Sequence, residues 1–246
     1  MEIKKAKKTI KKALLLCGGR GTRLAPLTDS IQKALIPVNG KPILEHLVLL
    51  FKKYGVNEIY FAIGYLGEQV KEYFGDGSKF GIIARYIEEN EPLGTAGCLR
   101  LARKEFASLF NEPFFMSNGD ELKSLDLAEM EKFHAENKAS VTIALLEVED
   151  PSAYGVAKMD GNRISEFVEK PKKEEAPSNL INSGLYIIEP SVIDMIPEGF
   201  AMMEKEVFPK LAVQGKLFGY AFKGQWFDTG TFERLERAKK EWKGIN

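Results

Sequence analysis

Short apolar runs alternate with amphipathic stretches through the first half of the chain. The apolar runs cover residues 13–17, 58–63, 82–88 and 113–117, and each has the length of a buried strand. Between them, residues 42–54, 67–74 and 94–106 place apolar side chains at intervals close to 3.6 residues, which predicts helices. A further helix is expected at 126–137 and a further strand at 139–148. Strands that alternate with helices in this order are typical of a parallel sheet.

The pattern changes after about residue 150. Two strand-like runs, 154–159 and 163–169, flank Asp160-Gly161-Asn162, which is a strong hairpin turn signal. The remainder predicts strands at 180–188, 216–222 and 226–228, helical stretches at 191–195, 203–213 and 231–242, and a charged loop at 170–178. With 246 residues the chain is long enough for one full hydrophobic core, so we expect one large α/β domain over residues 13–246.

The composition limits the classes of partner. Lys and Arg number 35, as do Asp and Glu, so there is no overall basic field to recruit nucleic acid. No segment approaches the ~20 apolar residues that span a bilayer, so no membrane partner is expected. Two cysteines, Cys17 and Cys98, cannot form a disulfide framework or a zinc site, which favours a cytoplasmic location. A homo-oligomer is left open.

The first twelve residues carry six lysines. The apolar run that follows has only five residues before the glycines, which is too short for a signal peptide. We expect residues 1–12 to be a solvated, flexible leader, and the alternative is electrostatic contact with anionic lipid or a partner.

A glycine-rich turn directly follows the first predicted strand. Residues 18–23 read Gly-Gly-Arg-Gly-Thr-Arg. Glycines tolerate positive φ and leave no side chain in the way, so their backbone N–H groups can turn onto phosphate oxygens. Arg23 and Lys33 are then placed to neutralise a leaving pyrophosphate. The spacing fits neither G-x-G-x-x-G nor G-x-x-x-x-G-K-[ST], which argues against a dinucleotide-binding fold and a P-loop.

Two aspartates are candidate metal ligands. Asp120 follows the strand predicted at 113–117, at the sheet edge where α/β proteins bind ligands, and Asp228 lies between a strand and a helix. Two carboxylates completed by substrate phosphates suit Mg²⁺. Taken alone, an aspartate after an apolar run is more often a helix cap or a turn residue. Together with the glycine turn they indicate nucleotidyl or phosphoryl transfer, which depends on metal ligands more than on acid–base groups.

Three residues of the second half stand out for their surroundings. Lys170 precedes a proline in a charged loop, where a lysine is ordinarily solvated. Asn182 places a side-chain amide within an apolar strand, so it must hydrogen-bond to backbone or to a ligand. Gly155 lies in a strand, which can mark close approach of a ligand to the backbone.

The motifs, taken in order, resemble one family. CGGRGTRLAPLT, QKALIPVNGKPIL, EPLGTAG, SNGD, YGVAKMD, FVEKP, INSGLYI, EKEVFPKLA and WFDTGT cover nearly the whole chain. They are similar to the signature of the sugar-1-phosphate nucleotidylyltransferases, or NDP-sugar pyrophosphorylases. The resemblance implies a Rossmann-like, GT-A-like nucleotidyltransferase core with a mixed sheet flanked by helices, and an inserted sugar-binding β-sheet. It further implies Mg²⁺ and the reaction NTP + sugar 1-phosphate ⇌ NDP-sugar + pyrophosphate.

By position, the resemblance assigns roles along the chain. It implies that residues 13–150 mainly bind the nucleotide, and that residues 151–246 mainly bind the sugar and supply the second metal aspartate. The triphosphate would be lined by Gly18, Gly19, Gly21 and Thr22, and the pyrophosphate would face Arg23 and Lys33. Mg²⁺ would be held by Asp120 and Asp228. The sugar phosphate would be bound by Lys170, and the sugar would contact Glu169, Asn182 and Gly155. Gln32 departs from the family, where proline often precedes the lysine, and this predicts a less rigid loop before Lys33.

The loop at 89–97, which includes Gly94 and Thr95, is expected to read the base. LGTAG looks most like the mannose-1-phosphate guanylyltransferase branch, with mannose 1-phosphate or a related hexose or heptose 1-phosphate as the sugar substrate. Glu89 offers two acceptors for the adjacent N1–H and N2–H donors of guanine, whereas uracil and thymine present one N–H between two carbonyls. A solvated charge at the strand end is an equal interpretation of Glu89. A UTP- or dTTP-dependent glucose-1-phosphate or amino-sugar-1-phosphate enzyme is the alternative.

Two rival classes make different predictions. A GT-A glycosyltransferase should carry Asp-x-Asp, and this sequence has none. A non-catalytic regulatory protein that binds nucleotide sugars would be expected to have lost Arg23, Asp120 or Asp228, and all three are present.

Overall fold

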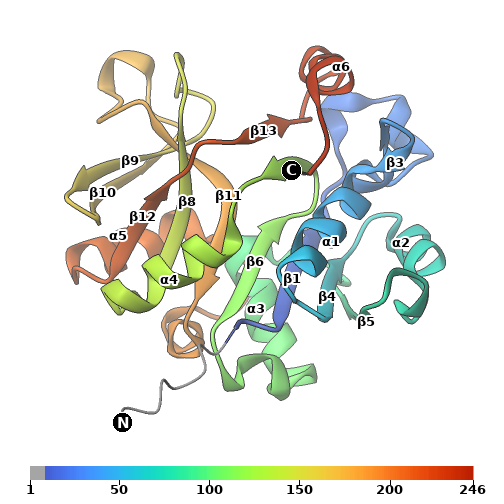
Figure 1. Cartoon of the computed structure of the whole chain (residues 1–246), viewed down its shortest axis with the longest axis horizontal. Helices are drawn as coiled ribbons and strands as arrows, with labels where there is room; N and C mark the ends of the chain where they lie inside the picture. Colours follow the sequence, from blue (N-terminus) through green and yellow to red (C-terminus); the bar gives the residue numbers. More distant parts are fainter. Residues whose placement is uncertain (1–8, 246) are drawn as a thin grey trace, which may run out of the picture.

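One mixed sheet of nine strands runs through the computed structural model, which describes residues 9–245 (Figure 1). The strands are β1 (Lys12–Cys17), β4 (Glu58–Ile63), β5 (Ile83–Glu88), β6 (Phe114–Asn118), β8 (Val141–Glu147), β9 (Gly155–Asp160), β10 (Arg163–Glu169), β11 (Leu180–Ile188) and β12 (Leu217–Ala221). They lie in the order β5-β4-β1-β6-β11-β8-β12-β10-β9, with the parallel strands towards the right of Figure 1 and the β9–β10 hairpin at its left.

The first half forms the parallel part of the sheet, as the alternating pattern predicts. β1 pairs in parallel with both β4 and β6, and β4 pairs in parallel with β5. Ala13, Leu14 and Leu15 are fully buried, which is typical of a parallel strand that is covered on both faces. Because β1 and β6 run in the same direction, the glycine turn and the Asp120 turn emerge from the same edge of the sheet.

A strand from the second half lies at the centre of the sheet. β11 runs antiparallel to β6 on one side and to β8 on the other, while β12 runs parallel to β8. The β9–β10 hairpin turns at residues 160–163, as predicted, and β9 also pairs with β11. The β-strands expected as an added sugar-binding region are therefore continuous with the main sheet.

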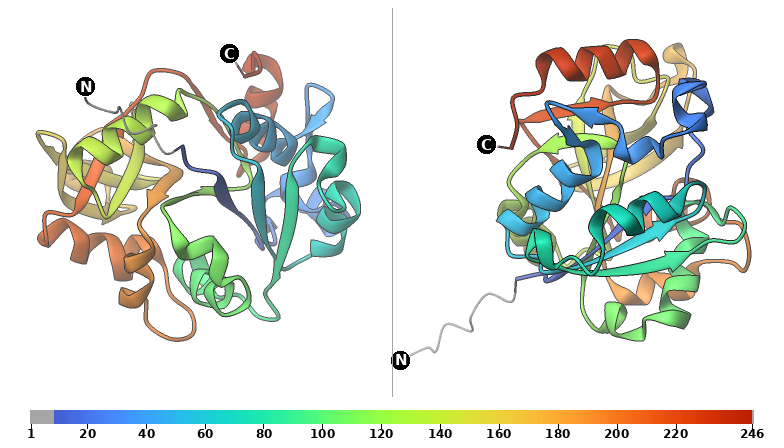
Figure 2. Two further views of the ribbon diagram at one scale, coloured as in Figure 1. Left: turned by 60° about the horizontal axis from the view of Figure 1, so that its bottom comes forward. Right: turned by 90° about the vertical axis from the view of Figure 1, so that its right-hand side faces the viewer.

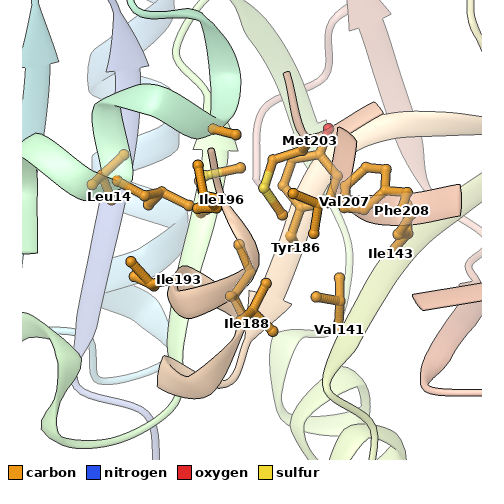
Figure 3. Packing of buried hydrophobic residues seen from close by; sticks show 14 of the residues in the cluster. Leu14, Val141, Ile143, Tyr186, Ile188, Ile193, Ile196, Met203, Val207 and Phe208 are labelled. Carbon is orange, nitrogen blue, oxygen red and sulfur yellow. The ribbon is translucent and has the colours of Figure 1, made fainter. Parts of the chain in front are cut away.

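Helices cover both faces of the sheet (Figures 1 and 2). They are α1 (Ile43–Lys53), α2 (Gly67–Phe74), α3 (Gly94–Glu105), α4 (Leu127–Asn137), α5 (Phe208–Val213) and α6 (Phe232–Glu241). α1, α2 and α4 pack on the face that carries Leu15, whereas α3 and α5 pack on the face that carries Leu14. Figure 3 shows this second core, in which Tyr186 of β11 and Phe208 of α5 lie side by side with ring centroids 5.4 Å apart.

Two small antiparallel pairs complete the fold. β2 (Pro37–Val38) pairs with β3 (Lys41–Pro42), and β7 (Glu121–Ser124) pairs with β13 (Gln225–Asp228). Leu235 of α6, and Trp242 directly after this helix, pack onto a separate apolar cluster that includes Leu24 and Ile36. The C-terminal helix thereby covers the segment that follows the glycine turn.

Burial and strand pairing already involve residues 10–12, which the prediction assigns to the leader. Residues 1–8 of the expected leader lie outside the described residues. Ile10 is only 7% exposed and its backbone N–H donates to Glu131 at 3.3 Å, while Lys12 already belongs to β1. The structure therefore differs from the expected leader at residues 10–12, because Ile10 is buried and Lys12 pairs with Glu58. Of the helices between residues 9 and 245, none is long and apolar enough to cross a membrane.

The predicted helical stretches of the second half contain three helix types. Residues 191–195 lie in a 3₁₀ helix, Pro190–Met195. Residues 203–213 are divided into a π-helical turn, Met203–Val207, and α5. Single π turns often occur at functional sites, and this one carries Glu204.

Candidate active site

The glycine turn follows the end of β1, and its backbone is held by a hydrogen bond from a residue a few positions further on. Gly21 has φ 66°, and its carbonyl accepts from the Thr28 hydroxyl at 2.9 Å. A Cβ at Gly21 would lie 2.9 Å from Thr28 Cγ2, so both the backbone angle and the packing require glycine here. A Cβ at Gly19 would meet nothing within 4 Å, so its backbone faces open space. Thr22 and Arg23 follow in a 3₁₀ turn and are exposed.

Gln32 ties the next segment to β1. Its side chain is buried, with Nε2 donating to the Cys17 carbonyl at 2.5 Å and Oε1 accepting from the Ala34 N–H at 2.5 Å. Its backbone N–H donates to Gln69 at 2.8 Å. The prediction of a less rigid loop is therefore wrong, because glutamine replaces the stiffness of proline with hydrogen bonds at both ends of its side chain.

A cavity of about 440 Å³ opens between the glycine turn and the start of α3. Seven of the sequence-predicted residues line it: Gly18, Gly19, Lys33, Glu89, Gly94, Thr95 and Asp120. Leu16, Cys17, Arg20, Gln32, Ala34, Pro92, Asn118 and Phe200 complete the lining. Residues distant in sequence thus converge on one cavity, but Gly21, Thr22 and Arg23, which were expected beside them, do not line it.

Lys33 and Asp120 form an ion pair on the wall of this 440 Å³ cavity. The Lys33 side chain is largely buried, while the Asp120 side chain is about one-third exposed. Burial alone would raise the pKa of Asp120, but the ammonium groups of Lys33 and Lys123 outweigh it and hold the pKa below its ordinary value. Asp120 is therefore an anion at neutral pH, as a metal ligand must be.

Asp228 lies on the segment next to Asp120. The β7–β13 pairing sets Asp228 opposite Glu121, and the Thr229 hydroxyl donates to the Asp120 carbonyl at 2.7 Å. The Asp228 carboxylate forms an ion pair with Arg234 and accepts from the Gly230 N–H at 2.6 Å.

Asp228 lines a second cavity, and the Arg23 guanidinium lies near it. Asp228, Tyr154, Trp226 and Arg234 line this cavity of about 780 Å³. A Cβ at Gly230 would lie 2.8 Å from Asp228 Oδ1 and 2.9 Å from the Arg23 guanidinium. The Arg23 guanidinium therefore lies on the same side of Gly230 as the Asp228 carboxylate.

The donor chemistry of the two aspartates fits Mg²⁺. Two carboxylates lie on adjoining segments, and Mg²⁺ is commonly bound by one or two carboxylates with phosphates and water as its other ligands. Each carboxylate is paired with a side-chain cation here, Asp120 with Lys33 and Asp228 with Arg234. Residues 9–245 hold no cluster of three or more acidic, His or Cys side chains suited to a metal. The other ligands would have to come from substrate or water.

Glu89 stands just beyond β5, with its carboxylate beside the glycine turn. Oε2 accepts from the Leu93 N–H at 3.0 Å, and Oε1 would lie 3.5 Å from a Cβ at Gly18. Burial raises the pKa of Glu89, and the Leu93 hydrogen bond lowers it only in part. Glu89 is thus a half-buried wall residue of the 440 Å³ cavity, which excludes the interpretation as a fully solvated charge.

The start of α3 is held by a loop from the second half of the chain. The Ala201 carbonyl accepts from the N–H groups of Ala96 and Gly97 at 2.9 and 3.2 Å. Gly94 has φ 76°, and a Cβ there would lie 2.4 Å from the Ala201 oxygen. The Thr95 hydroxyl donates to Glu204 at 2.6 Å. Gly94 and Gly97 therefore allow close packing against residues 199–201, and the Thr95 side chain is committed to Glu204.

The expected sugar-side residues form a separate group. Lys170 is exposed, has φ 49°, and forms an ion pair with Glu169 at 3.2 Å. Gly155 lies opposite Glu169 in the β9–β10 pairing, and a Cβ there would lie 2.4 Å from the Phe167 ring and 2.9 Å from Glu169 Oε2. Glycine at 155 thus makes room for these side chains. These residues do not line the 440 Å³ or the 780 Å³ cavity.

Asn182 finds its hydrogen-bond partners inside the protein. Its Nδ2 donates to the Tyr186 hydroxyl at 2.8 Å, and its Oδ1 accepts from the Gly184 N–H at 2.9 Å. Both bonds span the irregular stretch of β11, where the pairing with β8 shifts register. The Asn182 amide stabilises the irregular part of the strand. A sugar that contacted this amide would compete with its two hydrogen bonds or add to them.

Sequence reasoning missed several residues around the site. Glu121 accepts from Asn118, Trp226 and the fully buried Lys123. These three contacts anchor the β7–β13 pair beside both aspartates. Glu204, Arg234 and Phe200 were also missed. A buried lysine or a contact between distant segments has no signal in one sequence, although the charged EKE motif marks Glu204.

A family described as nucleotidyl transferase matches residues 12–243. The chain is 43% identical over 222 residues to the mannose-1-phosphate guanylyltransferase catalytic subunit beta of Xenopus tropicalis, covering 89% of this chain and 61% of that protein. It is 40% identical over 222 residues to mannose-1-phosphate guanylyltransferase 1 of Arabidopsis thaliana, with the same coverage of 89% and 61%. The chain thus spans about three fifths of the length of these relatives.

Solved structures share the fold. A provisionally named glucose-1-phosphate thymidylyltransferase from Bacillus anthracis, solved with sucrose, superposes with a TM-score of 0.86 at 28% identity, over 96% of each chain. A UDP-glucose pyrophosphorylase with UDP-glucose superposes with a TM-score of 0.82 at 24% identity, over 95% of this chain and 98% of that one. The expected mixed α/β architecture is therefore confirmed.

Proposed function

Because the chain belongs to the nucleotidyl transferase family, we propose that it joins a nucleoside triphosphate to a sugar 1-phosphate, releasing pyrophosphate. The observation that carries the proposal is the 440 Å³ cavity, where the glycine turn, the Lys33–Asp120 pair and Glu89 meet. In this assignment the turn binds the triphosphate through backbone N–H groups at Gly18, Gly19, Gly21 and Thr22.

The proposed reaction requires the sugar phosphate to be placed next to the α-phosphorus and the negative charge of the phosphates to be neutralised. A phosphate monoester has its second pKa near 6, so the sugar phosphate arrives mainly as a dianion and needs no general base. Lys170 would orient this nucleophile towards the α-phosphorus, while Arg23 and Lys33 would stabilise charge on the departing pyrophosphate. When bound by Asp120 and Asp228, Mg²⁺ would supply further charge neutralisation at the phosphate oxygens.

Salt bridges would be exchanged as substrate binds. Lys33 and Arg234 neutralise the two aspartates in this structure, and phosphate oxygens compete for the same cations. A polyanion with its metal ion can replace both ion pairs without leaving a charge unpaired, which limits the cost of breaking them. Lys33 would then move from Asp120 to phosphate.

GTP and mannose 1-phosphate, or a related hexose or heptose 1-phosphate, are the proposed substrates. Glu89 supports guanine, because it lines the cavity and its Oε1 lies beside Gly18. Oε2 already accepts from the Leu93 N–H, so Oε1 is the acceptor proposed to receive the base donors. The names of the Xenopus and Arabidopsis relatives support the same base and mannose 1-phosphate. Gly155, Glu169, Lys170 and Asn182 are proposed to contact the sugar phosphate.

UTP or dTTP with glucose 1-phosphate is the second candidate. The superposition on the Bacillus anthracis thymidylyltransferase favours it, since that likeness extends over nearly the whole of both chains. A non-catalytic regulatory role would leave no need for Arg23, Asp120 and Asp228, and all three are present. A cytoplasmic location is part of the proposal, supported by Cys17 and Cys98, which are buried free thiols.

Pyrophosphate release across GTP, ATP, UTP and dTTP, each with mannose 1-phosphate and glucose 1-phosphate, tests the proposal. We expect turnover with Mg²⁺, highest for GTP with mannose 1-phosphate. Highest turnover for dTTP or UTP would favour the second candidate. No turnover with any pair, from protein that binds nucleotide, would favour the regulatory role.

A further inference from the structure

One exposed aromatic side chain lines the 440 Å³ cavity. Phe200 is 65% exposed, although it is a large apolar residue. The other large exposed apolar side chains of residues 9–245 are Ile83, Val213 and Phe232, and none of them lines either cavity of the site. Exposing an apolar ring to water has a free-energy cost that binding of a flat, apolar ligand face would remove.

The loop that presents Phe200 is held firmly. Ala201 is fully buried, its N–H donates to the Leu93 carbonyl at 2.9 Å, and its carbonyl accepts from two N–H groups of α3. On the other side, the Arg100 guanidinium donates to the Ile196 carbonyl and to Glu198, both at 3.1 Å. The ring is therefore exposed by a fixed backbone, which gives a preorganised contact.

The backbone of one residue, Leu93, connects the Phe200 loop with Glu89. The Leu93 N–H is bound by Glu89 Oε2, and the Leu93 carbonyl is bound by the Ala201 N–H. The Phe200 ring also lies over Gly94, where a Cβ would come within 3.2 Å of Cε2. An acceptor for the edge of a base and a flat apolar surface for its face are thus held in a fixed relation on one cavity wall.

We propose that Phe200 stacks on the nucleotide base and contributes to a preference for purines over pyrimidines. The inference rests on the proposed nucleotide site and identifies a second residue that recognises the base. Stacking of a base on an aromatic side chain is removed by alanine substitution, and the loss corresponds to about five- to hundredfold in affinity. A purine presents two fused rings to the phenyl face and a pyrimidine one, so the loss should be larger for GTP than for UTP.

Equilibrium binding of GTP, UTP and inorganic tripolyphosphate, each with Mg²⁺, tests this role. Phe200→Ala should weaken GTP binding about five- to hundredfold, weaken UTP binding less, and leave tripolyphosphate binding unchanged. Phe200→Trp should retain GTP affinity. Phe232→Ala removes an exposed phenyl ring that lines neither cavity, and should bind all three ligands as wild type does.

Several results would overturn the inference. Unchanged GTP affinity in Phe200→Ala would refute it, as would equal losses for GTP and tripolyphosphate, which would mean that the ring supports the loop. A change of oligomeric state in sedimentation with unchanged affinity would make Phe200 a subunit contact instead. GTP binding that depends on Phe200, in a protein that forms no NDP-sugar, would contradict only the proposed reaction. Wild-type protein that binds no nucleotide would overturn both.

Discussion

Replacing Glu89 with glutamine tests how the base is recognised. Glu89 has two separate tasks in the structure: Oε2 holds the Leu93 N–H at 3.0 Å, while Oε1 faces the cavity beside Gly18. Glutamine can keep its carbonyl oxygen on Leu93, so the loop should remain in place. The amide NH₂ then replaces the acceptor that faces the cavity, and it would meet the N1–H and N2–H donors of guanine.

The size of the effect follows from this exchange of an acceptor for a donor. Losing a charge-assisted hydrogen bond and leaving a buried donor unpaired costs about 1–3 kcal/mol. GTP should therefore lose roughly ten- to hundredfold in kcat/KM. UTP and dTTP should lose far less or improve, because an amide can pair with their N3–H and carbonyl edge.

The assay is kcat/KM for GTP, ATP, UTP and dTTP at a fixed concentration of sugar phosphate. Glu88→Gln is the matched control, because Glu88 is exposed and forms a surface ion pair with Lys71 at 2.7 Å. That variant should behave as wild type with all four nucleotides. Equal losses for the four nucleotides in Glu89→Gln would mean that Glu89 supports the loop and does not read the base.

The pH dependence of kcat/KM for GTP is a second test of the role of Glu89. Burial raises the pKa of Glu89, so this carboxyl takes up a proton at higher pH than an exposed glutamate does. Protonation removes the negative acceptor, and kcat/KM for GTP should therefore fall as pH decreases through that raised pKa. The Glu89→Gln profile should lack this fall. If kcat/KM of the variant fell at low pH as that of wild type does, the fall would be due to another titrating group.

Further substitutions separate the metal, sugar and structural roles. Asp120→Asn and Asp228→Asn should each lower kcat by several orders of magnitude with the fold retained in circular dichroism; folded variants with wild-type turnover would exclude them as metal ligands. Lys170→Ala should raise KM for the sugar phosphate and leave NTP affinity nearly unchanged in calorimetry, and the reverse pattern would contradict its assignment. Gln32→Ala removes two buried side-chain hydrogen bonds, so Tm should fall by about 2–10 °C. An unchanged Tm would show that these bonds do not hold the loop.

The sequence predicted the local elements well where composition changes sharply. β4 and β10 occupy the predicted ranges, because apolar or alternating runs end at turn residues or charges. The hairpin turn at Gly161 and the glycine turn at Gly21 were also predictable, since both need positive φ. These features depend on neighbours in the sequence, which is why periodicity and turn signals detect them.

Features that depend on distant contacts could not be predicted in this way. The position of β11 between β6 and β8 follows from pairing over many residues, which periodicity does not report. β7 was missed because it is short and includes Lys123, a residue type that is ordinarily solvated but is fully buried against Glu121 here.

The residues of the site also divide into those that the sequence predicted and those that depend on distant contacts. Motif order predicted seven of the residues that line the 440 Å³ cavity. Gln32 was misjudged because its hydrogen bond reaches the Cys17 carbonyl, 15 residues away in the sequence. Phe200 was not recognised, because an exposed phenylalanine in a loop has no distinguishing pattern until the loop is seen beside Gly94. The pairing of Asp228 with Arg234 on α6 also required the tertiary structure.

The most direct test of the central claim follows the oxygen atoms of the sugar phosphate. Mannose 1-phosphate labelled with ¹⁸O in its phosphate group would be incubated with GTP, Mg²⁺ and the protein, and the masses of the products would be measured by mass spectrometry. Attack of the sugar phosphate on the α-phosphorus predicts that all label remains in GDP-mannose and that the pyrophosphate carries none. Label in pyrophosphate or in free phosphate, or release of pyrophosphate with GMP and no nucleotide sugar, would contradict nucleotidyl transfer.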